Sequence, residues 1–107
     1  MNFNQYQEQA KITAIYPVVG ESYVYPMIGL SGEVGELNEK IKRVFRGSYS
    51  LEEIKPALLL ELGDILWYVT MVATEFGFSM DDVASTNLEK LNKRMSEGKI
   101  NGSGDNR

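Results

Sequence analysis

The stretch that decides the fold runs from residue 29 to residue 44 and reads GLSGEVGELNEKIKRV. Apolar side chains recur along it at alternating spacings of four and three, the period of an amphipathic helix: Leu30, Val34, Leu37, Ile41 and Val44. A second stripe of the same kind comes later in the chain and holds Leu58, Leu62, Ile65, Val69, Val72 and Phe76. Neighbouring helices usually pack antiparallel when a short segment joins them, so the two stripes predict a helical hairpin.

Turn and cap residues delimit the other helices. The first helix is expected over residues 4–16, because Pro17 stops it and a loop with Gly20 follows. The hairpin's first helix should begin at Pro26, a favoured first-turn residue, and stop at Gly47. A capping-box pattern opens a last helix over residues 79–97.

The hairpin's second helix has a mixed start. Ser50 and Glu53 match a capping box, but Pro56 disfavours helix in the residue before it, which predicts a short opening turn ahead of the main body. Altogether we expect an all-α, four-helix bundle-like domain over residues 1–97. Residues 98–107 should form an irregular C-terminal tail, since three glycines fall within them.

Two pairs of acidic residues stand beside the apolar stripes. Glu33 with Glu36, and Glu61 with Asp64, are each spaced three apart, so each pair shares one helix face. Both pairs lie at about 60° and 120° from the leucine that opens their stripe, at about 100° per residue. In an antiparallel hairpin the four carboxylates would converge. Mutual repulsion and lost hydration then favour a bound cation, and oxygen-only ligands suit Mg²⁺ or Mn²⁺.

A plainer interpretation has to be weighed, because an acidic helical protein produces E-x-x-E by chance and such a pair is usually a solvated face. The second pair at matching offsets weakens that interpretation. So do Gly29, Gly32 and Gly35, each of which costs a helix about 0.5–1 kcal/mol relative to alanine. Close helix approach or room for a ligand would explain these glycines.

Composition excludes several chemistries. The 107 residues include no cysteine and no histidine, so disulfides, thiolate sites and imidazole bases are absent, and the usual zinc or non-haem iron ligand sets are disfavoured. The net charge of −4 argues against a nucleic-acid duplex as partner. Apolar stretches that fall short of a membrane span and a polar start over residues 1–10 predict no membrane association and a cytoplasmic protein.

The last helix offers a complement to the acids. Asn87, Lys90 and Arg94 form one polar stripe, and two cations with an amide can hold phosphate oxygens. Alone this is weak, since basic residues commonly lie near a helix C-terminus. The segment from Gly102 to Arg107 either folds over a bound ligand, with Arg107 touching phosphate, or is irregular.

Assembly is suggested by a second apolar side of the helix that carries Glu61. Leu60, Trp67 and Met71 point away from its main stripe, and a helix that is apolar all round is buried. Another copy of the chain would cover this side most simply, so we expect a homodimer or homotetramer. The first helix or the tail is the alternative cover.

Three motifs together resemble a known family. The runs GLSGEVGELNEKIK (29–42), LELGDILWYV (60–69) and NLEKLNKR (87–94) are similar to MazG-like nucleotide pyrophosphohydrolases of the all-α nucleoside triphosphate pyrophosphatase superfamily. The resemblance covers about residues 4–95. One departure is that the family motif often begins with two acids, whereas Gly32 precedes Glu33 here.

The resemblance implies both an activity and the residues that perform it. The activity is Mg²⁺-dependent hydrolysis of a nucleoside triphosphate between its α and β phosphates, which yields the monophosphate and pyrophosphate. The four paired acids would bind the metal, and Glu33 or Glu36 would be the catalytic carboxylate that lies nearest the attacking water and accepts its proton. Asn87, Lys90 and Arg94 would meet the phosphates. Tyr68, on the acids' side of its helix, is a candidate for substrate binding through the base.

Other functions remain open at this point. A phosphoribosyl-ATP pyrophosphohydrolase or a dUTPase-like enzyme would share the fold and the metal site but not the substrate. A non-catalytic helical dimerisation or regulatory module with a structural ion comes from a different class. A carboxylate-bridged di-iron protein is disfavoured because those sites use Glu-x-x-His.

Overall fold

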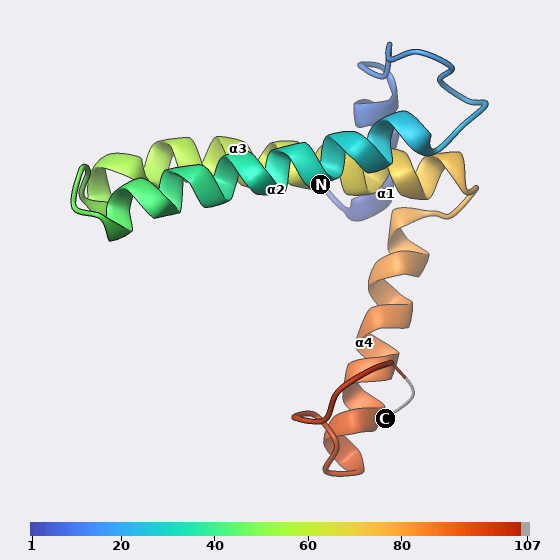
Figure 1. Ribbon diagram of the computed structural model, residues 1–107. Coiled ribbons are helices and arrows are strands. Elements are labelled where there is room, and N and C mark those ends of the chain that lie inside the picture. The colour runs from blue at the N-terminus through green and yellow to red at the C-terminus, as the bar shows by residue number, and fades with distance from the viewer. Residues whose placement is uncertain (106–107) are drawn as a thin grey trace.

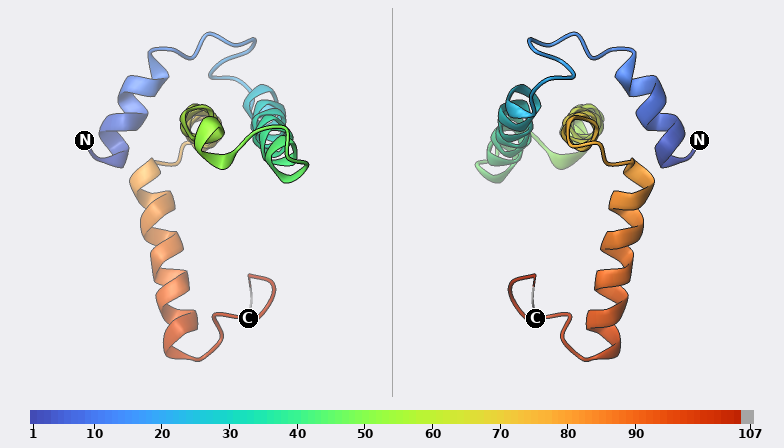
Figure 2. Two further views of the ribbon diagram at one scale, coloured as in Figure 1. Left: turned by 90° about the vertical axis from the view of Figure 1, so that its left-hand side faces the viewer. Right: turned by 90° about the vertical axis from the view of Figure 1, so that its right-hand side faces the viewer.

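The computed structural model describes residues 1–105 and contains four α-helices (Figure 1): α1 (Phe3–Lys11), α2 (Val24–Phe45), α3 (Leu51–Glu75) and α4 (Met80–Ser96). The described residues include no strand, so the expected all-α class is confirmed. The long helices α2 and α3 lie side by side as an antiparallel hairpin. α1 packs against α3 and α4, and α4 leaves the hairpin crosswise (Figure 2).

Local chemistry sets the turns at both ends of α3. Ser50 and Glu53 form the expected capping box, in which each side chain accepts a hydrogen bond from the other residue's backbone N–H. Gly47 follows α2 with φ +85°, and Gly77 follows α3 with φ +78°. Glycine adopts this left-handed conformation without steric cost, which lets the chain reverse after each helix.

Two expected helix boundaries were wrong. α1 ends at Lys11 rather than near Tyr16, because the chain turns there and carries the Tyr16 ring into the core. That ring stacks on Tyr25 at 5.3 Å between centroids and meets Trp67 edge-on at 6.2 Å. The short turn expected before α3 is also absent, since α3 runs without a break through Pro56. Pro56 is the sixth residue of α3 and lies inside the helix, where it costs the helix one backbone hydrogen bond without ending it.

A buried glutamine joins three helices. The Gln7 amide of α1 donates to Thr74 Oγ1 on α3 and to the Phe78 carbonyl after it, both at 3.0 Å, while Gln7 Oε1 accepts from the backbone N–H of Met80 at 2.9 Å. All of these groups lie at the α3–α4 connection. Because a buried amide must keep its partners, this clamp fixes the direction in which α4 departs.

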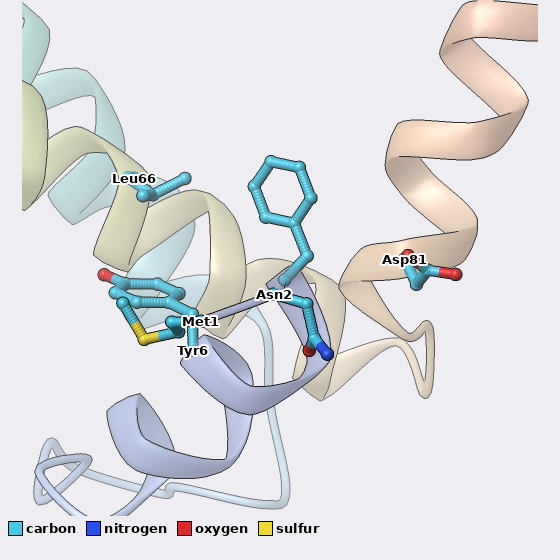
Figure 3. Close-up of a pocket in the computed structure, with 6 residues that line it drawn as sticks. Met1, Asn2, Tyr6, Leu66 and Asp81 are labelled. Carbon is cyan, nitrogen blue, oxygen red and sulfur yellow. The ribbon is translucent and has the colours of Figure 1, made fainter.

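The crosswise course of α4 leaves the four helices of one chain without a closed bundle, and the molecule extends over 42 × 40 × 27 Å. An open pocket lies in the angle between α1, α3 and α4, where Tyr6, Leu66 and Asp81 come from the three helices (Figure 3). Its walls are mostly apolar. An adjoining pocket continues along α4 past Val83 and Leu88.

The second apolar side of α3 is covered in part by the same chain. Met71 is fully buried against α1, and Trp67 packs there too, with its indole N–H donating to Thr13 Oγ1 at 2.9 Å. For these two residues the alternative cover, the first helix, is therefore the correct one. Leu60, in contrast, is 71% exposed, and its neighbour Leu59 is 73% exposed.

By length and composition, α3 is also apolar enough to cross a membrane, with a mean hydropathy of 1.5 over its most apolar window. This differs from the expectation that every apolar stretch falls short of a span. Glu61 and Asp64 lie within α3, and α2 packs along it. We therefore interpret α3 as the central helix of this fold.

One of the three α2 glycines permits close helix approach, as expected. A Cβ at Gly29 would overlap the Tyr68 ring of α3, whereas Gly32 and Gly35 face open space. Close packing thus accounts for Gly29. Gly32 and Gly35 leave open space beside α2, the helix that carries Glu33 and Glu36.

Gly29→Ala should therefore lower the free energy of unfolding by about 1–3 kcal/mol, the usual cost of overpacking. Gly32→Ala is the matched control and should raise it by about 0.5–1 kcal/mol through helix propensity. Urea unfolding followed by circular dichroism measures both. Equal effects of the two substitutions would show that the Gly29–Tyr68 contact does not restrict which side chain α2 accepts at residue 29.

Candidate functional site

Carboxylates from α2 and α3 meet across the hairpin. Glu33 on α2 and Glu61 and Asp64 on α3 each offer an oxygen, and these oxygens all lie within 4.8 Å of one another. Glu61 is 8% exposed, and Asp64 lies on the open side. We call these three residues the acid cluster. The convergence predicted from sequence spacing is thus observed for three of the four acids.

Glu36 is exposed and lies beside the acid cluster rather than within it. Its charge nevertheless acts on the cluster, since it is one of the groups that raise the pKa of Glu33. The fourth predicted ligand therefore lies at the rim of the site.

Two oxygens of the acid cluster lack hydrogen-bond donors. The Oε2 atoms of Glu33 and Glu61 are buried and have no partner. The pKa of Glu33 is raised to about 7. Burial is the largest cause, and the Glu61 side chain and the charges of the neighbouring acids add to it. Near neutral pH the two glutamates can therefore share a proton. Glu61 itself keeps a lowered pKa, because its first partner is the ammonium of Lys40.

Two unpartnered buried carboxylate oxygens, with a third carboxylate beside them, fit a divalent ion. Hard cations such as Mg²⁺ and Mn²⁺ take oxygen ligands of this kind, and water can fill the remaining positions on the open side. Glu33, Glu61 and Asp64 would hold the ion. The donor set contains no nitrogen or sulfur ligand, in keeping with the composition.

Lys40 is a residue that the sequence analysis missed. Its Nζ donates to Glu61 Oε1 at 2.9 Å, from α2 to α3. The available signal was its spacing, four residues after Glu36 and seven after Glu33, which places it on the face of the acids.

Tyr68 lies against the hairpin seam on the acids' side, as its helical angle predicted. Its ring packs against Gly29 and meets Trp67 edge-on at 5.1 Å. Burial raises the pKa of Tyr68, and the charges of Tyr25, Glu33, Asp64 and Glu36 add to the effect. The Tyr68 hydroxyl therefore lies where the charges of the acids act on it.

The predicted phosphate-binding residues lie elsewhere in the chain. Asn87, Lys90 and Arg94 are on α4, whose second half extends away from the hairpin (Figure 1). Asn87 and Lys90 line a pocket of about 470 Å³ that also includes Phe78 and Val83. A single chain therefore does not bring this stripe to the acid cluster.

The C-terminal tail returns to the same face of α4. Asp105 Oδ1 accepts from Lys90 Nζ at 3.0 Å and from Arg94 Nη2 at 3.1 Å, and the Gly104 carbonyl accepts from Arg94 Nη2 at 3.3 Å. Arg94 is 5% exposed, and its Nε is buried without a partner. Asp105 was not among the residues predicted from sequence, and Arg107 lies outside the described residues.

The fold and the acid cluster together define an all-α class of protein with a carboxylate cluster that fits a divalent ion. The chain belongs to the MazG nucleotide pyrophosphohydrolase family, because the model of that domain matches residues 25–98. The Gene 37 protein of Mycobacterium phage L5 is similar to it, with 40% identity over 114 aligned residues that span the whole of both chains. No solved structure matches the chain.

The raised pKa of Glu33 predicts how the stability of the metal-free protein depends on pH. The folded protein binds this proton more tightly than the unfolded chain, whose value is about 4.5, so the stabilisation is complete below pH 4.5 and is lost as pH rises to about 7. Thermal unfolding in EDTA should show a Tm that falls between pH 5 and pH 8.

Glu33→Gln should flatten that pH profile, because the amide does not titrate in this range. Glu8→Gln, an exposed acid on α1, is the control and should leave the profile unchanged. A wild-type Tm that rises from pH 5 to pH 8 would contradict the assigned environment of Glu33.

Proposed function

We propose that this protein is a Mg²⁺-dependent nucleoside triphosphate pyrophosphohydrolase that cleaves between the α and β phosphates. The observation that carries the proposal is the acid cluster, with its two buried oxygens that lack partners, in a chain of the MazG family. The reaction adds one water across the α–β anhydride and releases a nucleoside monophosphate and pyrophosphate.

Within this proposal the four acids have two different roles, metal binding and proton transfer. Glu33, Glu61 and Asp64 hold the ion, which when bound would neutralise charge on the phosphates and make a water more acidic. Glu36, at the rim and outside the tight group, is placed to accept the proton of the attacking water. Tyr68 borders the same side of the hairpin and offers a hydroxyl and a ring edge to the substrate.

Phosphate binding falls to α4. Lys90 supplies a point charge, and Arg94 supplies a planar fork whose Nη2 already donates to Asp105. Asn87 adds an amide on the same stripe. In the chain as folded, the Asp105 carboxylate already occupies both cations, so a triphosphate has to displace it.

A second copy of the chain would unite the two halves of the site. The hairpin carries the anionic acids, α4 carries the cations, and one chain holds them apart. Exposed apolar residues on both elements, Leu59 and Leu60 on α3 and Leu88 on α4, suit burial against another copy. We therefore propose a homodimer or homotetramer whose active site contains groups from two chains, and we place the protein in the cytoplasm without a nucleic-acid duplex or membrane partner.

Incubation with a panel of nucleoside triphosphates and Mg²⁺, followed by separate assays of pyrophosphate and orthophosphate, tests the activity. Pyrophosphate is the expected product. Orthophosphate as the first product would contradict α–β cleavage. Turnover restricted to dUTP or to phosphoribosyl-ATP would identify the related enzyme classes, and no turnover would favour a non-catalytic module.

Glu61→Gln should abolish Mg²⁺-dependent turnover, because it removes a ligand from the buried centre of the acid cluster. Glu36→Gln should lower kcat by about 10²–10⁴-fold, the usual size of general-base catalysis, while Mn²⁺ affinity changes little. Calorimetric Mn²⁺ titration beside steady-state kinetics separates the two roles. Loss of Mn²⁺ affinity in Glu36→Gln would make Glu36 a ligand instead.

Asp105→Asn should lower the KM for triphosphates several-fold, because the neutral amide competes less well for Lys90 and Arg94. Lys90→Ala should raise the KM. Steady-state kinetics at fixed Mg²⁺ measures both variants. A higher KM in Asp105→Asn would mean that the tail carboxylate supports the substrate site rather than blocking it.

A further inference from the structure

Lys40 makes an ion pair unlike the others of the helical hairpin. Its partner Glu61 lies on the opposite helix, and the two side chains are only 28% and 11% exposed. The pairs Lys42–Glu39 and Lys55–Glu52 each join residues three apart on one helix, and their side chains are 47–80% exposed. Within residues 1–105, no other ion pair joins two helices.

The ion pair engages one carboxylate oxygen of Glu61 and leaves the other oxygen without a partner. Oε1 accepts from Lys40 Nζ at 2.9 Å, and Oε2 is buried without a partner. A carboxylate held at one oxygen cannot rotate freely about its last bond. The Glu61 carboxylate is then kept in one orientation beside Glu33 and Asp64, the other members of the acid cluster.

We propose that Lys40 is a positioning residue that orients the Glu61 carboxylate for the divalent ion. The inference rests on the proposed metal site and adds to it a residue that touches neither the ion nor the substrate. Partners that hydrogen-bond to a ligating carboxylate fix its orientation, and their loss typically weakens metal binding by about 10–100-fold.

Lys40 could instead compete with the divalent ion for Glu61, and this role predicts the opposite change in metal affinity. An ammonium beside the acids supplies positive charge of its own, so it could compete with the ion for Glu61. If competition dominated, removal of Lys40 would free Glu61 and strengthen metal binding. If orientation dominates, removal weakens metal binding in spite of the more negative site.

Mn²⁺ binding to the full chain, without substrate, distinguishes these roles. Electron paramagnetic resonance counts free Mn²⁺ directly, and calorimetry gives an independent Kd. Lys40→Met keeps the length and apolar stem of the side chain, and we expect its Kd to rise by about 10–100-fold. Lys40→Arg keeps a charged donor and should retain most of the wild-type affinity.

Matched controls exclude a general effect of charge or folding. Lys42→Met removes the same charge two residues away on the same helix and should leave the Kd unchanged. Lys40→Gln keeps a neutral donor and should fall between the Arg and Met variants. Far-UV circular dichroism verifies the helical fold of each variant before titration.

Unchanged or tighter Mn²⁺ binding by Lys40→Met and Lys40→Gln would overturn the proposal. So would a Lys40→Arg variant as weak as Lys40→Met. A wild-type protein that binds no Mn²⁺ would overturn the metal site as well, so failure of the proposed function can be told apart from failure of the Lys40 inference alone.

Discussion

The structure depends on holding like charges together between two packed helices. Glu33 and Glu61 each place a carboxylate oxygen at the α2–α3 seam where neither water nor a donor reaches it. Such an arrangement is costly unless a cation compensates. Lys40 compensates one oxygen of Glu61, and the remaining unpartnered oxygens define where a divalent ion fits. The close approach of Gly29 to Tyr68 brings the two helices together near this point.

Periodicity was sufficient to predict the hairpin and the acid cluster. Apolar stripes at helical spacing gave α2 and α3, and matching angular offsets placed Glu33, Glu61 and Asp64 on facing sides. Glu36 escaped this reasoning because angular offset does not say how far a flexible side chain reaches. The Glu33–Glu36 pair shares a face of α2, yet Glu33 is half-buried and Glu36 is exposed.

Features that depend on tertiary contacts were beyond the sequence. α1 ends early and the Tyr16 ring stacks on Tyr25 in the core, a contact between segments that no local sequence signal predicts. The direction of α4 depends on hydrogen bonds from Gln7, a residue more than seventy positions from the Met80 N–H that it accepts. Asp105 pairs with Lys90 and Arg94 through a return of the chain that the glycine-rich tail does not predict.

The Gln7 side chain anchors α4 at its first residue and leaves the rest of that helix without this support. One of the three Gln7 hydrogen bonds holds Met80, the first residue of α4, and the other two hold Thr74 on α3 and the Phe78 carbonyl. Lys90 and Arg94 lie in the second half of α4. A small change of angle at such a pivot becomes a large displacement at the tip. The N-terminal helix thereby sets the course of the helix that carries Lys90 and Arg94.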